Sequence, residues 1–96
     1  MIIKLSKSNR KGKKFMVEVD DKKIHFGASG YSDYTINKND KKMKAYIARH
    51  KPREKWGKSG IKTAGFWSRW LLWNKKTITS SIKDIENRFN INILYR

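Results

Sequence analysis

Basic side chains gather in two stretches of this 96-residue chain, and lysine and arginine at such density could neutralise the phosphates of a nucleic acid. Residues 1–14, the N-terminal basic cluster, hold six basic and no acidic residues, while residues 38–62, the central basic cluster, hold ten basic and two acidic residues. The predicted nucleic-acid contacts are Arg10, Lys11, Lys13, Lys14, Lys41, Lys42, Lys44, Arg49, Lys51, Arg53, Lys55, Trp56, Lys58 and Lys62.

Three of these residues offer planar groups as well as charge or apolar area. The guanidinium groups of Arg49 and Arg53 and the indole of Trp56 can stack on bases. Trp56 stands outside the main tryptophan segment and among basic residues, so it is predicted to be the exposed aromatic contact. Phosphate contacts carry no sequence information, and sequence specificity is therefore not predicted.

Catalytic signals are weak. His25 and His50 are too few for a structural zinc site, and the chain has no cysteine. A metal-dependent nuclease would use an acidic pair followed by lysine, as in residues 18–22, but adjacent carboxylates on a strand point apart. His50 and Glu54 could form an acid–base pair, but Pro52 interrupts the helical phase between them. The prediction is a non-enzymatic protein with no metal or cofactor; a nuclease is the least favoured alternative.

The elements that position these residues are organised around residues 63–74, which hold three of the four tryptophans. This segment is predicted to be a helix, with Thr63 as N-cap and Asn74 at its end. A core role is favoured over an exposed stacking platform. The apolar run is about half of the ~20 residues needed to span a bilayer, which excludes a membrane span. The predicted core residues are Phe66, Trp67, Trp70, Leu71, Trp73, Ile82, Ile85 and Phe89.

The other periodic segments predict a single α+β domain over residues 1–96, with an N-terminal antiparallel β-meander, about three helices and a short C-terminal strand. His25 is expected to face solvent, and residues 27–36 to form a glycine-rich loop. Asn37 or Asn39 is predicted to cap the first helix, and Thr77 or Thr79 the last. The predicted strands are 2–5, 13–19, 22–27 and 91–95, and the helices are 40–50, the tryptophan segment, and a last helix containing 78–89. The tryptophan helix should then lie centrally, sandwiched among three apolar surfaces.

The net charge of +16 exceeds what solubility requires and predicts a polyanionic partner. Nucleic acid is the first expectation; an acidic protein or an anionic membrane comes second. The amino terminus lacks the apolar run of a signal peptide, so secretion is not expected.

Five segments carry a resemblance to a known group of proteins: His25 to Gly27, Gly30 to Thr35, Tyr46 to His50, Glu54 to Trp56, and Thr63 to Asn74. Over about residues 25–89 the chain resembles a small family of uncharacterised proteins encoded by large nucleocytoplasmic DNA viruses. The N-terminal hairpin lies outside this pattern.

The resemblance implies a viral setting, in which short basic proteins package a genome or cement a capsid. The expected location is the virion, or otherwise the cytoplasm or nucleus of the host. The leading hypothesis is a virion-associated protein that binds nucleic acid. The alternative is a minor capsid or cement protein that binds acidic capsid subunits. No small-molecule substrate is expected.

Overall fold

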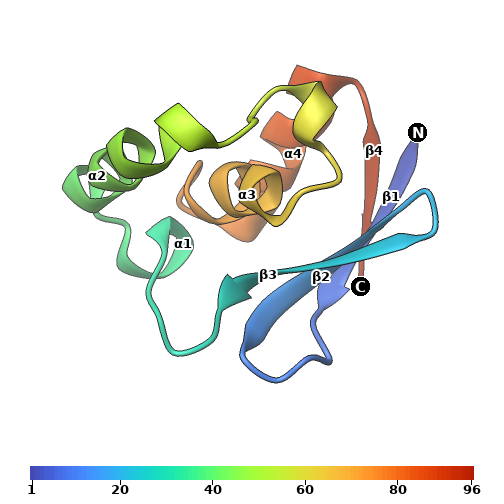
Figure 1. Cartoon of the computed structure of the whole chain (residues 1–96), viewed down its shortest axis with the longest axis horizontal. Helices are drawn as coiled ribbons and strands as arrows, with labels where there is room; N and C mark the ends of the chain where they lie inside the picture. The colour runs from blue at the N-terminus through green and yellow to red at the C-terminus, as the bar shows by residue number, and fades with distance from the viewer.

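The computed structural model describes residues 1–96 as a four-stranded mixed sheet with the helices on one face (Figure 1). The strand order is β3-β2-β1-β4. The first three strands are antiparallel neighbours, and the C-terminal strand lies parallel to β1 at the edge of the sheet. The strands are β1 (Ile2–Lys7), β2 (Lys13–Val19), β3 (Lys22–Ala28) and β4 (Asn92–Tyr95).

The predicted antiparallel meander is confirmed, and its register follows from the alternation of side chains. Val17 and Val19 point into the core together with Phe26 of the neighbouring strand, and all three are buried. Asp20 and Asp21 both adopt positive φ, 48° and 67°. This conformation at two successive residues is typical of the tight turn that joins two twisted antiparallel strands, here β2 and β3. The pleat therefore gives the sheet one apolar face for the helices to cover.

The helices begin where polar side chains cap them. Asn39 caps the first long helix, Thr63 the tryptophan helix and Thr77 the last, each accepting a backbone N–H. The α-helices are α1 (Tyr34–Asn37), α2 (Asp40–His50), α3 (Ala64–Trp67) and α4 (Ile78–Phe89). Short 3-10 turns, η1 (Lys51–Arg53) and η2 (Lys58–Gly60), interrupt the basic loop, and a π-helical turn, η3 (Ser68–Leu72), continues α3.

The tryptophan helix lies at the centre of the core, as predicted, between the sheet, α2 and α4 (Figure 1). Trp67 is fully buried, and its Nε1 atom donates to the carbonyl of Ile61 at 2.7 Å. Trp70 Nε1 donates to the carbonyl of Trp56 at 2.8 Å. These bonds satisfy the polar edges of the indoles, so burial is favourable. Five of the predicted core residues are buried: Phe66, Trp67, Trp70, Leu71 and Ile85. The other three are half-buried and pack against the core: Trp73, Ile82 and Phe89.

The structure corrects the prediction for the tryptophan helix in one respect. It is not a regular α-helix to Asn74: from Ser68 the backbone widens, and the N–H of Trp73 donates to the carbonyl of Ser68, five residues earlier, at 3.1 Å. The helix ends at Leu72. π-Helical turns are uncommon, and they are frequently found at functional sites.

Three other local predictions differ from the structure. The predicted loop 27–36 contains the start of α1, where the Asp33 side chain caps the helix. His25 is half-buried rather than directed to solvent, because its Nδ1 atom shares a hydrogen bond of 2.7 Å with Ser8 Oγ. Trp56 is half-buried rather than exposed, because its ring packs against the core and lies nearly parallel to that of Tyr46.

Helix α2 stands farthest from the sheet (Figure 1). It is joined to the core by Tyr46, whose ring stacks on Trp73 with centroids 4.7 Å apart. The space between α2 and the sheet is therefore only partly filled, and a cleft opens there. None of the helices combines the length and the apolar character that crossing a bilayer would require.

Candidate functional site

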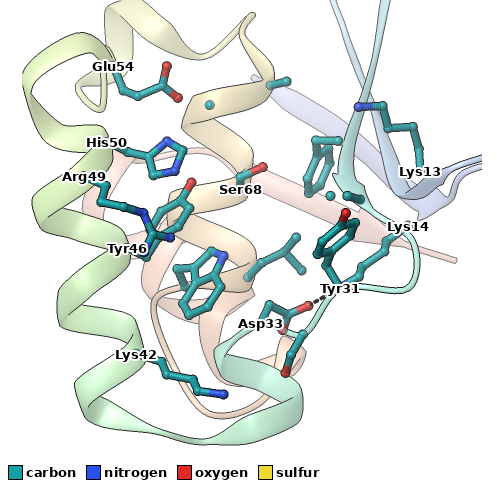
Figure 2. A pocket seen from close by; sticks show the side chains of 18 of the residues that line it. Lys13, Lys14, Tyr31, Asp33, Lys42, Tyr46, Arg49, His50, Glu54 and Ser68 are labelled. Carbon is teal, nitrogen blue, oxygen red and sulfur yellow. Dashed lines mark hydrogen bonds and ion pairs between the residues drawn. The ribbon is translucent and has the colours of Figure 1, made fainter.

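A cleft of about 620 Å³ opens between α2 and the adjoining ends of β2 and β3 (Figure 2). Helix α2 forms one wall, the other is formed by β2, β3 and the loop after β3, and the tryptophan helix forms the floor. The wall of α2 contributes Lys42, Tyr46, Arg49 and His50; the opposite wall includes Lys13, Lys14, Gly27, Tyr31 and Asp33; the floor includes Gly65, Ser68, Leu72 and Trp73.

Both basic clusters reach this cleft. Lys13 and Lys14 come from the N-terminal basic cluster, and Lys42 and Arg49 from the central one. On α2, Lys42, Tyr46 and Arg49 follow at spacings of four and three, which puts them on one face of the helix. The fold thus brings together charges that are far apart along the chain.

One of the four cations is already neutralised. Lys14 Nζ lies 2.6 Å from Asp33 Oδ2, and the Asp33 side chain is only 3% exposed. The other Asp33 oxygen accepts hydrogen bonds from the backbone and hydroxyl of Thr35. Asp33 is therefore a structural carboxylate that fixes the β3–α1 loop against β2.

The remaining three cations, those of Lys13, Lys42 and Arg49, have no acidic partner. Each is exposed at the margin of the cleft. Exposed cations without carboxylate partners attract an anion at little cost, because they lose no existing ion pair when it binds. The cleft is therefore suited to an anionic ligand.

Aromatic rings line the side of the cleft next to α2. The buried Tyr46 ring stacks on His50 with centroids 4.2 Å apart, as well as on Trp73. Burial, and then the negative charge of Glu54, raise the pKa of Tyr46 to about 12. Its hydroxyl therefore stays protonated at neutral pH.

A half-buried cation supports this aromatic group from the side of the core. The guanidinium of Arg69 lies 4.5 Å from the ring centroid of Trp70 and 5.5 Å from that of Trp56, and it donates to the carbonyl of Trp73. Burial, and then the charge of Arg88, lower the pKa of Arg69. The arginine takes part in cation–π contacts that hold the floor of the cleft together.

His50, Ser68 and Glu54 also line the cleft, but no hydrogen bond joins any two of them. No three histidine or carboxylate side chains lie close enough to hold a metal ion together. The Glu54 carboxylate instead lies against the backbone of Gly65, where an added Cβ would stand 1.8 Å from Glu54 Oε2. Glycine is thus the residue that lets this carboxylate sit beside the tryptophan helix.

The other predicted contacts lie outside the cleft. Lys62 pairs with Asp20 at 3.4 Å, with both side chains exposed. Trp56 belongs to the aromatic group around Tyr46 and does not line the cleft. The remaining predicted residues are exposed on surfaces away from it, namely Arg10, Lys11, Lys41, Lys44, Lys51, Arg53, Lys55 and Lys58.

Sequence reasoning missed Tyr31, which stands 73% exposed on the loop after β3. The available signal was the presence of two tyrosines, Tyr31 and Tyr34, in a short glycine-containing loop, and such loops usually just connect packed elements. It also missed Ser68, which reaches the cleft from the π-helical turn. Both residues line a cleft only because the fold places α2 across from β2 and β3.

Comparison with known proteins yields one family. The chain has no significant match to a curated protein or to a solved structure. One family model matches residues 3–50, which contain both walls of the cleft but not its floor. Since that match covers half of the sequence, the chain belongs to the family of unknown function DUF5754.

Proposed function

We propose that the protein binds the phosphate backbone of nucleic acid without catalysing a reaction on it. The observation that carries this proposal is the meeting of both basic clusters at one cleft, where Lys13, Lys42 and Arg49 have no acidic partner. The net charge of +16 adds long-range attraction for a polyanion. Cations outside the cleft, such as Arg10 and Lys11, would extend the contact along the chain of phosphates.

Salt dependence tests this proposal, because binding to phosphates releases counterions. Fluorescence anisotropy with labelled DNA and RNA should show affinity falling steeply between about 50 and 200 mM salt. The double variant Lys13→Gln, Lys42→Gln should bind more weakly, with a salt slope smaller by about two, one for each lost phosphate contact.

The matched control removes the same charge elsewhere. Lys4 on β1 and Lys83 on α4 are exposed and lie outside the cleft. The double variant Lys4→Gln, Lys83→Gln should keep most of the affinity and the slope. Binding that does not respond to salt, or equal losses in the two double variants, would argue against the cleft as the phosphate site.

A second function, that of a minor capsid or cement protein, is favoured by a different surface. Ile2 and Leu94 are 64% and 46% exposed on neighbouring strands β1 and β4, and β4 is an open edge of the sheet. Exposed apolar residues beside an open strand edge suit a protein contact. The viral setting comes from the resemblance described above, and both functions would place the protein in the virion.

Fractionation of purified particles separates the two functions. A nucleic-acid-binding protein should be lost from shells that lack the genome. A cement protein should persist in empty shells at a fixed ratio to the capsid subunits. The first outcome supports the proposed function and the second replaces it.

A further inference from the structure

The loop that carries Tyr31 holds an aromatic ring in the open at the margin of the cleft. Tyr31 is 73% exposed, and its ring stacks on no other aromatic residue of the chain. Figure 2 shows it on the wall opposite α2, near Lys13 and Lys14. The other exposed aromatic residue, Tyr95, lies beside Phe15 with ring centroids 6.4 Å apart, so Tyr31 is the one exposed ring without an aromatic neighbour.

The loop that carries this ring is tied to the sheet at both ends. Ser29 N donates to the carbonyl of Gly12 at 3.0 Å, which ties the start of the loop to the β1–β2 turn. The ion pair between Asp33 and Lys14 holds its other end. A loop anchored at both ends loses little backbone freedom when a ligand stacks on the ring that it carries, which favours binding.

Size and charge limit what can bind beside it. The cleft has a volume of about 620 Å³, within the range of about 300–1,000 Å³ that encloses small ligands. A duplex exposes its backbone and the edges of its bases, but the faces of its bases are stacked on one another, so no base within the duplex is free to stack on the ring of Tyr31. An unpaired strand can turn single bases outward onto an aromatic ring while its phosphates follow a basic groove.

We infer that the cleft takes an unpaired strand of nucleic acid, with one base stacked on Tyr31 and the adjoining phosphates on Lys13, Lys42 and Arg49. This inference rests on the proposed function and names the form of nucleic acid that the cleft selects. The loop wall supplies the aromatic surface, and both walls supply the cations.

The Glu54 carboxylate sets the limit of the phosphate path at one end. Figure 2 shows Glu54 at the end of α2 opposite Lys42. It is the one cleft carboxylate that forms no ion pair, since Asp33 is paired with Lys14. Its charge repels a phosphate at that end, so the strand passes nearer to Lys42.

The test compares a labelled single strand of thymidines with a blunt duplex of equal phosphate number. The wild-type protein should prefer the single strand. Tyr31→Ala should weaken single-strand binding by about tenfold, which is typical of losing one stacked base, and leave duplex binding unchanged. Tyr31→Phe should bind like the wild type, because the ring is kept.

Two further variants sharpen this test. Tyr95→Ala removes another exposed tyrosine, outside the cleft, and should bind both forms like the wild type. Glu54→Gln should bind the single strand more tightly, because it removes the repelling charge at one end of the strand's path. Circular dichroism spectra that match the wild type establish that each variant is folded.

Several outcomes overturn the inference. The first is equal loss on single strand and duplex in Tyr31→Ala, and the second is a duplex that binds as tightly as the strand. A third is equally tight binding of polyglutamate with the same charge, since it carries no bases. In the first two cases nucleic-acid binding itself survives; if neither form of nucleic acid binds, the proposed function fails as well.

Discussion

The Nζ atom of Lys14 lies 2.6 Å from the Oδ2 atom of Asp33, in an ion pair whose carboxylate is almost wholly buried. This contact joins β2 to the loop that carries Tyr31, and so it shapes one wall of the cleft. A buried carboxylate that also caps a helix cannot lose its partner cheaply, and the first prediction follows from this.

Asp33→Ala should lower the free energy of unfolding by about 3 kcal/mol, because it leaves the charge of Lys14 unpaired and removes the cap of α1. Urea denaturation measures this change. Lys62→Ala is the control, since the exposed pair of Lys62 with Asp20 should contribute about 0.5 kcal/mol or less. Similar losses for the two variants would contradict a structural role for the buried pair.

Arg69→Met should destabilise the protein by about 1–2 kcal/mol, although it removes a charge from a chain with a large positive excess. The loss arises because Arg69 contacts the faces of Trp56 and Trp70 and donates to the Trp73 carbonyl. Thermal unfolding measures it. Arg53→Met, at an exposed position, should have little effect or a slightly stabilising one; an Arg69→Met variant as stable as this control would refute the proposed packing role.

The pKa of His25 should rise when a polyanion binds. Partial burial, followed by the charges of Arg10 and Lys23, lowers this pKa below its ordinary value of 6.5, and Lys13 adds a smaller effect of the same sign. Bound phosphates would offset these cationic charges, so binding should take up a proton and strengthen as the pH falls from 7 towards 6.

NMR titration of the His25 ring, with and without oligonucleotide, measures this shift. The stability of the free protein should depend on pH in the opposite direction to binding. Because the folded pKa lies below the unfolded one, the unfolded state binds more protons, and the free energy of unfolding falls as the pH drops below about 6.5. His25→Gln should reduce both dependences; a pKa of His25 that does not change on binding would count against phosphates near the hairpin.

Asp84 should contribute to stability at neutral pH and lose this contribution in acid. Partial burial alone would raise its pKa, but hydrogen bonds from Asn74 and Arg88 outweigh this and lower the pKa below 3.8. The contribution is therefore present above about pH 4 and is lost as the pH falls through the folded pKa. Melting temperatures of Asp84→Asn and the wild type should differ at pH 7 and converge as the pH falls below the folded pKa of Asp84; a constant difference would contradict this account.

The segments of this fold were predictable because local rules govern them. The spacing of three and four between Ile82, Ile85 and Phe89 is typical of a helix. The alternation of Phe15, Val17 and Val19 is typical of a strand. Thr63 and Asn39 mark helix starts because their side chains satisfy free backbone N–H groups. The α+β class and the central place of the tryptophan helix followed from these patterns.

The cleft was not predictable in the same way. The basic clusters were visible in the sequence, but they contain many cations, and nothing local distinguishes Lys42 and Arg49 from Lys41 and Lys44. The distinction arises because Tyr46 stacks on Trp73 and so turns one face of α2 towards β2. Trp56 was assigned the wrong exposure for a similar reason, since its basic neighbours in sequence are not its neighbours in space.

The sequence by itself determined the strands, the long helices, the core residues and the excess of positive charge, because periodicity, capping and net charge are local or additive properties. Only the tertiary structure decided that Lys13 faces α2 across one cleft, and that Tyr31 stands exposed at its margin. It also decided that β4 joins the sheet beside β1, in parallel. These relations depend on which surfaces pack together over long distances in the chain, and packing is a property of all the elements at once.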